Sequence, residues 1–220
     1  TMTHNMEHGA FVISLDFELH WGVRASRSLE SYRQNLLGAR QAVPRLLQMF
    51  TEFGVHATWS TVGFLFCADR TELLRNMPEW RPNYRDRRLC SYQELEHIGD
   101  NETDDPFHYA PSLVRAIIST PNQEIGTHTF SHVYCLEAGC DLESFEEDLA
   151  AAMRVAEPYG VRPRSIVFPR NQYGPEHMAA CARQGIIAYR GNPDGWVYKP
   201  RTRSGETWAV RGLRLADAYV

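Results

Sequence analysis

Short apolar runs alternate along this chain with longer segments whose apolar residues recur at helical spacing. The apolar, β-branched runs predict five strands, and they lie at residues 10–16, 55–62, 123–127, 165–168 and 186–189. The periodic segments predict helices at residues 36–53, 64–77, 112–119, 142–158 and 174–184. Strands that alternate with helices form a parallel sheet with helices outside it, either open or closed into a barrel. Chemistry in such folds gathers beyond the carboxyl ends of the strands.

Length and composition fit one ordinary globular domain. The chain has 220 residues, of which 43% are hydrophobic, and its formal net charge is −4, with the basic residues scattered. This charge pattern gives no surface for nucleic acid, and no apolar run reaches the ~18 residues of a membrane span. We therefore expect a single domain over residues 1–220. An irregular, polar excursion at about 79–110 is expected to wall a substrate cleft.

The N-terminal sequence and the cysteines bear on the compartment. The first twenty residues lack a basic segment followed by an apolar one, so the expected location is the cytoplasm. The five cysteines form no CxxC pair, and we expect free thiols rather than a disulfide framework.

Two carboxylates follow the first predicted strand, in the sequence SLDFE. Asp16 and Glu18 are two residues apart, so an extended backbone would point both side chains to the same side. Carboxylates this close together are costly unless they share a cation or a proton.

Two histidines follow the third predicted strand, in the sequence THTFSH. His128 and His132 are four residues apart, and one turn of helix would place both imidazoles on one face. The pair is expected at the same edge of the sheet as Asp16 and Glu18. Two histidines and one carboxylate form an open metal site with room for water and substrate. A metal there would lower the pKa of its bound water to roughly 7, and the second carboxylate would take the proton.

The segments SLDFE, THTFSH and VFPRNQYG, in this order, resemble the polysaccharide deacetylase family, the NodB-homology carbohydrate esterases. The resemblance runs from about residue 11 to residue 196 and implies a distorted, incomplete β/α barrel of mainly parallel strands. It also implies that Asp16 is the general base and that Glu18, His128 and His132 hold a divalent metal. Zinc is the expected ion, with cobalt, nickel, iron or manganese as alternatives.

Two motifs depart from the family pattern. The first has Glu18 one residue beyond the usual second Asp, a spacing similar to the intracellular branch of the family. The third, arginine-x-proline-aromatic, has Val167 at the arginine position. Arg170, just after Pro169, is the predicted partner of Asp16, and its N–H is a candidate oxyanion donor. Asp194, in NPDGWVY, stands roughly where the family has an Asp that orients the arginine.

The family's closing leucine-x-histidine, which supplies the general acid, has no counterpart within residues 1–220, because no histidine follows His177. Either the sequence is part of a longer chain, or another group protonates the leaving amine. His20 is the candidate substitute for that acid. Trp21, Tyr173 and Trp196 are candidate pocket residues that would stack on a sugar ring.

The expected function is metal-dependent removal of an N-acetyl group from a sugar or glycan precursor. A precursor of surface polysaccharide, such as O-antigen of lipopolysaccharide or capsule, fits a cytoplasmic protein. Two alternatives stay open. One is a hydrolase of the same family that opens a cyclic amide or ureide such as allantoin. The other is a degenerate member that binds sugar without turnover. The sequence leaves the oligomeric state open.

Overall fold

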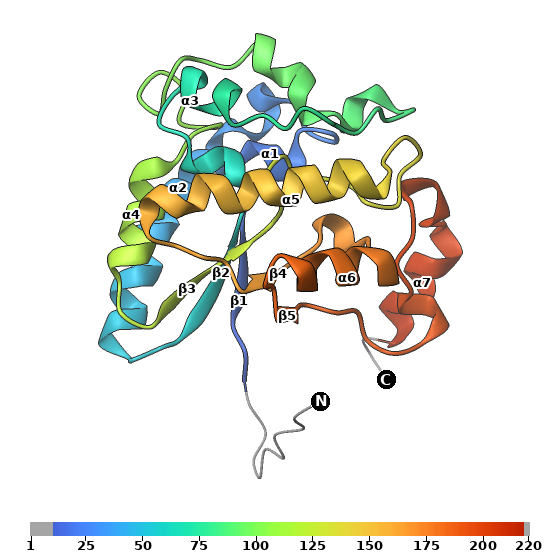
Figure 1. Ribbon diagram of the computed structural model, residues 1–220. Coiled ribbons are helices and arrows are strands. Elements are labelled where there is room, and N and C mark those ends of the chain that lie inside the picture. Colours follow the sequence, from blue (N-terminus) through green and yellow to red (C-terminus); the bar gives the residue numbers. More distant parts are fainter. Residues whose placement is uncertain (1–10, 218–220) are drawn as a thin grey trace.

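The computed structural model describes residues 11–217 and contains one five-stranded, all-parallel sheet. Its strands are β1 (Ser14–Phe17), β2 (Ala57–Thr61), β3 (Gln123–Thr127), β4 (Ser165–Ile166) and β5 (Ala188–Tyr189). Each strand pairs with the next one in the chain, so the spatial order is β1-β2-β3-β4-β5. This winding is that of a β/α barrel, whereas a doubly wound sheet reverses its strand order. The sheet curls into a half-barrel whose edges are β1 and β5, which confirms the predicted fold class (Figure 1).

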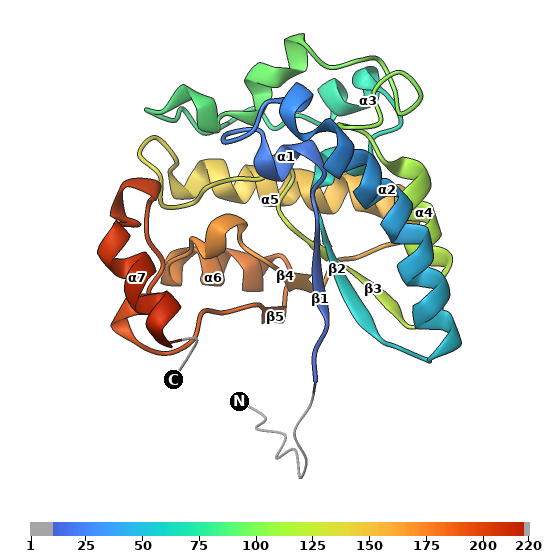
Figure 2. The same cartoon turned by 180° about the vertical axis from the view of Figure 1, so that it is seen from behind.

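Seven α-helices lie among the described residues; α2, α4, α5 and α6 flank the sheet, α1 and α3 lie above its carboxyl edge, and α7 lies at the periphery (Figures 1 and 2). They are α1 (His20–Val23), α2 (Leu29–Glu52), α3 (Arg70–Arg75), α4 (Pro111–Ser119), α5 (Leu142–Ala156), α6 (Pro175–Arg183) and α7 (Trp208–Asp217). Side-chain caps fix where several of them begin. Ser28, Asp69 and Asp141 each accept a hydrogen bond from the N–H three residues later, at the start of α2, α3 and α5.

The predicted helix at residues 64–77 is wrong. The chain instead forms a 3₁₀ turn at Gly63–Phe66 and then the short helix α3. All four residues of the turn are buried, whereas an amphipathic helix would bury only one face. The helix α7 lies in a segment for which the sequence predicted no element.

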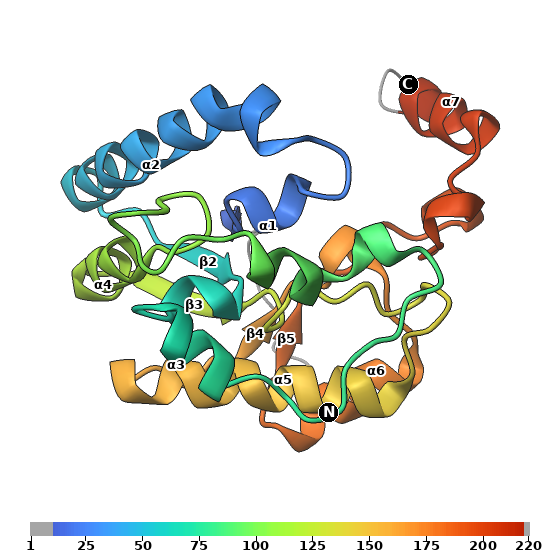
Figure 3. The same ribbon diagram turned by 90° about the horizontal axis from the view of Figure 1, so that it is seen from above.

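The segment at residues 79–110 is irregular and contains two 3₁₀ helices, Arg87–Leu89 and Ser91–Glu96. It lies over the edge of the sheet at which the strands end, as seen from above in Figure 3. Tyr92 of this segment donates a hydrogen bond to Asp148 of α5 at 3.1 Å, and the Tyr84 hydroxyl accepts one from the Tyr134 N–H at 2.8 Å. The excursion is thus attached to the loop that follows β3.

The core lies between the sheet and the helices around it. Its largest fully buried side chains include Trp21, Phe64 and Phe130, whose rings meet edge to face. A second cluster, around Phe145 and Phe168, packs beneath α5 and α6. All five cysteines are free, as expected. None of the helices over residues 11–217 is long and apolar enough to cross a membrane.

Candidate metal centre

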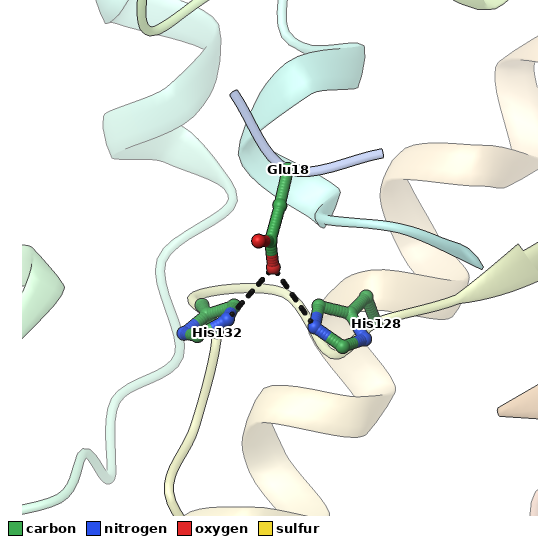
Figure 4. A group of neighbouring side chains, drawn as sticks. All are labelled: Glu18, His128 and His132. Carbon is green, nitrogen blue, oxygen red and sulfur yellow. Dashed lines mark hydrogen bonds and ion pairs between the residues drawn. The ribbon is translucent and has the colours of Figure 1, made fainter. Parts of the chain in front are cut away.

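Glu18, His128 and His132 converge at the carboxyl edge of the sheet (Figure 4). Glu18 Oε2 lies 3.2 Å from His128 Nε2 and 3.1 Å from His132 Nε2. One possible ligand atom from each residue lies within 4.8 Å of the other two. Two imidazoles that share one carboxylate oxygen place three electron-pair donors around a single point. This donor set fits a divalent cation such as zinc, as predicted from the sequence.

The two histidines meet through a loop, so the predicted helical turn between them is wrong. His128 follows β3 directly, and the backbone after it leaves helical geometry because Thr129 and His132 have φ values of 64° and 61°. The Thr129 hydroxyl accepts the Val133 N–H at 2.8 Å, which closes the loop. A non-glycine residue in the left-handed region carries strain, and such strain gathers at functional sites.

Asp148, on α5, accepts hydrogen bonds from the loop that carries the two histidines. Its carboxylate accepts the Phe130 N–H at 2.6 Å and the Ser131 N–H at 3.2 Å, and also the hydroxyls of Ser131 and Tyr92. The residue is fully buried, and burial raises its pKa to about 6 against the opposing effect of these donors. The conformation of the histidine loop therefore depends on one buried carboxyl group.

Two glycines allow close approach at the site. A Cβ on Gly22 would lie 1.9 Å from Cδ of Glu18, so any side chain there would displace the carboxylate. A Cβ on Gly63 would lie 2.8 Å from Cα of Phe130. The Gly63 N–H instead donates to the carbonyl of Thr129 at 2.9 Å, which joins the 3₁₀ turn after β2 to the histidine loop.

The charge states of the three residues suit a metal. Burial alone would raise the pKa of Glu18, but the hydrogen bonds to His128 and His132 outweigh it and hold that pKa well below its usual range. Burial lowers the pKa of His132, which favours the neutral imidazole that binds metals. The Nδ1 atoms of both histidines are buried and have no hydrogen-bond partner among residues 11–217. A site without such outer partners is expected to hold its metal more weakly.

Asp16 is not among the residues whose ligand atoms converge, and it is paired with an arginine that the sequence did not predict. Arg190, directly after β5, places Nη2 2.7 Å from Asp16 Oδ2. The pair links the two edge strands of the half-barrel. The predicted contact between Asp16 and Arg170 is wrong, because the guanidinium of Arg170 lies over the ring of Tyr134, 5.0 Å from its centroid. Arg170 and the residue after it have φ values of 55° and 52°, which turn the chain away from β1.

Asp194 and Trp196 lie in the segment after β5, and Tyr173 lies in the loop between β4 and α6. Asp194 is exposed, and no ion pair in the described part of the chain joins it to Arg170 or to Arg190, which pairs with Asp16 instead. Trp196 is 61% exposed in a 3₁₀ turn. Tyr173 is half-buried and stacks on Phe168 with ring centroids 5.0 Å apart. Of these, Trp196 alone offers a largely free aromatic face.

His20 and Trp21 are buried, which contradicts the prediction of His20 as the general acid and of Trp21 as a pocket residue. Trp21 is fully enclosed and donates its indole N–H to the carbonyl of His108 at 2.9 Å. The His20 Nδ1 lies 2.9 Å from His108 Nε2, and its Nε2 lies 3.3 Å from the Arg27 carbonyl. His108 Nδ1 lies 2.7 Å from Asp105. Both nitrogens of His20 are thus occupied, so the ring has no free nitrogen for a general acid.

Replacing His20 with Ala is therefore expected to lower stability without removing the metal. His20, His108 and Asp105 form a buried hydrogen-bonded cluster, and the variant leaves the Nε2 atom of His108 without its partner. We expect a loss of about 1–3 kcal/mol in the free energy of unfolding, measured by urea denaturation. The exposed His97→Ala serves as the control. Unchanged stability together with lost turnover would instead assign His20 to the reaction.

Sequence reasoning missed Arg190, Asp148 and Gly22. Arg190 directly follows the predicted strand at residues 186–189. Functional residues gather beyond the carboxyl ends of such strands, so the position of Arg190 in the sequence is a signal for it. Asp148 lies three residues after Phe145 and three before Ala151 in a predicted helix, a spacing that places an acid on the apolar face. Nothing in the sequence indicates that Gly22 faces Glu18.

Comparison with known proteins supports the fold. No protein-family model matches the sequence, and a search of curated proteins finds no match. Among solved structures, a candidate polysaccharide deacetylase from Mycobacterium smegmatis gives a TM-score of 0.51 at 16% identity, over 81% of this chain and 49% of that one. A family 4 carbohydrate esterase from Streptomyces lividans gives 0.44 at 14% identity, over 82% and 61%. A CE4 family pseudoenzyme from Bacillus anthracis gives 0.44 at 14%, over 81% and 42%.

The chain spans less than half the length of the first solved structures that it matches. At such low identity the likeness extends to the fold alone. Within that limit, the resemblance to the polysaccharide deacetylases that the sequence motifs indicate is confirmed.

Proposed function

We propose that this chain, which has the fold of the polysaccharide deacetylases, is a metal-dependent hydrolase that removes an N-acetyl group from a sugar. The observation that carries the proposal is the convergence of Glu18, His128 and His132 at the carboxyl edge of the sheet. Such a set leaves coordination positions open for water and substrate. The proposed substrate is a precursor of surface polysaccharide.

The residues divide the work as follows. Glu18, His128 and His132 would hold a divalent ion, which polarises an amide carbonyl and makes water a stronger nucleophile. Asp16 takes the proton of the attacking water at its carboxylate and returns it to the amide nitrogen as the C–N bond breaks, so that acetate and the free amine leave. Arg190 holds that carboxylate in place through the 2.7 Å ion pair. The backbone N–H of Arg170 is the proposed donor to the oxyanion that forms at the carbonyl.

Metal content and acetate release test this proposal together. The purified protein is expected to take up about one zinc ion per chain, and to release acetate from N-acetylglucosamine oligomers or from nucleotide-linked N-acetyl sugars. Chelation should abolish the release and added metal should restore it. A protein that takes up no ion from excess zinc, cobalt or nickel is not a metal-dependent hydrolase.

The same assay separates the two alternatives. A protein that binds metal and opens cyclic ureides, but releases no acetate from sugars, is an amidohydrolase of the allantoinase type. A protein that binds metal and N-acetyl sugar, but hydrolyses neither substrate, is a sugar-binding member without turnover.

Replacing Arg190 with Ala is expected to lower kcat by about 10–100-fold, because the Asp16 carboxylate loses the group that orients it. The change in KM should be small, since Arg190 is proposed to act through Asp16. Arg183→Ala is the matched control, because it removes an arginine from another exposed ion pair, with Glu146. Partial recovery with Arg190→Lys, and none with Arg190→Gln, is the expected signature of a charge that positions Asp16.

A further inference from the structure

A cavity of about 410 Å³ lies between the loop after β4 and the segment that ends in α7, and four of its seven lining residues are arginines. Its charged lining consists of Arg170, Arg201, Arg211, Arg214 and Glu206. The first of these lies in the loop after β4, and the others lie in the segment that ends in α7. Residues from two separate parts of the chain therefore bring like charges together around one hollow.

The positive charge of this cavity is only partly compensated. Arg214 is neutralised by Glu206, with Nη2 3.0 Å from Oε1 and Nη1 3.1 Å from Oε2. Over residues 11–217, no carboxylate lies within 4.0 Å of the side-chain nitrogens of the other three arginines. Like charges held in a concave wall focus their field and attract an anion.

Neutral groups hold these three arginines in place. Arg201 donates to the carbonyls of Val197 at 2.6 Å and Lys199 at 3.1 Å. The guanidinium of Arg211 lies 5.5 Å from the ring centroid of Trp208, and that of Arg170 lies over Tyr134. Carbonyls and ring faces fix the orientation of a guanidinium without neutralising it. Each arginine also carries five N–H donors, so donors remain for a ligand.

Two contacts join the cavity to the metal centre. The ring centroid of Tyr134 lies 5.0 Å from that of His132, and the guanidinium of Arg170 lies over the same ring, 5.0 Å from its centroid. Gln172 is fully buried; it accepts the Leu136 N–H at 3.3 Å and donates to the Arg201 carbonyl at 2.9 Å. The loop that carries His132 and the arginine wall are thus held together.

We propose that this cavity binds the phosphate or diphosphate group of an activated sugar whose N-acetyl group reaches the metal centre. The inference rests on the proposed function and narrows its substrate to a sugar that carries an anionic leaving group. In a 2-acetamido sugar the amide is on the carbon next to the anomeric carbon, so an anomeric phosphate lies beside the amide. Guanidinium groups match phosphate oxygens with paired hydrogen bonds.

Calorimetric titration with inorganic pyrophosphate tests the cavity directly. We expect the wild type to bind it, and Arg170→Ala together with Arg211→Ala to weaken binding about tenfold or more. Both arginines are exposed, so the double variant should fold normally. The control is Arg45→Ala, an exposed arginine on α2. No binding by the wild type, or equal binding by the double variant, overturns the proposal.

Two further binding measurements test where the anion binds and which class of activated sugar carries it. His128→Ala should still bind pyrophosphate, whereas loss of binding in that variant would place the anion on the metal and overturn the proposal. Binding of uridine diphosphate more tightly than pyrophosphate assigns the cavity to nucleotide-linked sugars. Tighter binding of farnesyl diphosphate in detergent assigns it to lipid-linked sugars. Because these are binding measurements, a protein that binds pyrophosphate but releases no acetate would refute the proposed function and leave the cavity assigned.

Discussion

Asp16→Asn is expected to keep its metal and to lose about 10²–10⁴-fold in kcat, the range of a general base. The amide occupies nearly the volume of the carboxylate and can still accept a hydrogen bond from Arg190, but it cannot take a proton from water. Metal content by elemental analysis and the rate of acetate release are the two measurements. The variant separates the group that accepts a proton from the groups that hold the ion.

His128→Ala is the companion variant and should differ from Asp16→Asn in its metal content. It removes a ligand, so both metal and turnover are expected to be lost, and added zinc should restore little. His97→Ala controls for the loss of a histidine, since His97 is exposed and outside the site. If Asp16→Asn turned over at the wild-type rate, Asp16 would not be the base and the proposed division of roles would fail.

Asp148→Ala is expected to cost about 3–5 kcal/mol in the free energy of unfolding. The change leaves the buried N–H groups of Phe130 and Ser131 without an acceptor and opens a hole beneath the histidine loop. Urea denaturation measures the loss. Because the loop carries both histidines, metal affinity should fall in the same variant. Glu147→Ala, the neighbouring acid on the exposed face of α5, is the control.

Asp148→Asn gives the pH dependence of this interaction. Burial raises the pKa of Asp148 to about 6 in the folded state, above its value in the unfolded chain. The folded protein therefore binds the proton more tightly, and the contribution of Asp148 to stability falls as pH rises from about 4 to 6. The difference in unfolding free energy between wild type and Asp148→Asn should shrink over that range. A difference that is constant with pH would mean that Asp148 is ionised throughout.

Periodicity and strand-end chemistry predict much of this molecule. The five strands, the all-parallel half-barrel and the convergence of Glu18, His128 and His132 follow from local patterns, because residues after parallel strands must meet at one edge. The backbone conformation that brings His128 and His132 together does not follow from these local patterns. The spacing of His128 and His132 is also compatible with a helix, and tertiary contacts, those of Asp148 and Gly63 among them, stabilise a strained loop instead.

The partner of Asp16 was unpredictable for a different reason. Several arginines follow predicted strands, and which guanidinium reaches Asp16 depends on how far the sheet curls, a property of the whole fold. The curl brings Arg190 to Asp16, while Arg170 turns to Tyr134. The wrong prediction for His20 also has its origin in contacts between distant segments. Its position beside Glu18 made it a candidate for chemistry, but the cluster with His108 and Asp105 depends on a segment almost ninety residues later.

The ion pair between Asp16 and Arg190 joins residues that are 174 positions apart. A chain emerges from the ribosome from its N-terminus, so the whole metal-binding trio is synthesised well before Arg190 appears. A nascent or truncated chain that stops after β4 would contain every ligand yet leave the base without its guanidinium. Under the proposed roles, the residues that would bind the ion are complete before the guanidinium that orients the base, so the capacity to bind the ion would precede full turnover.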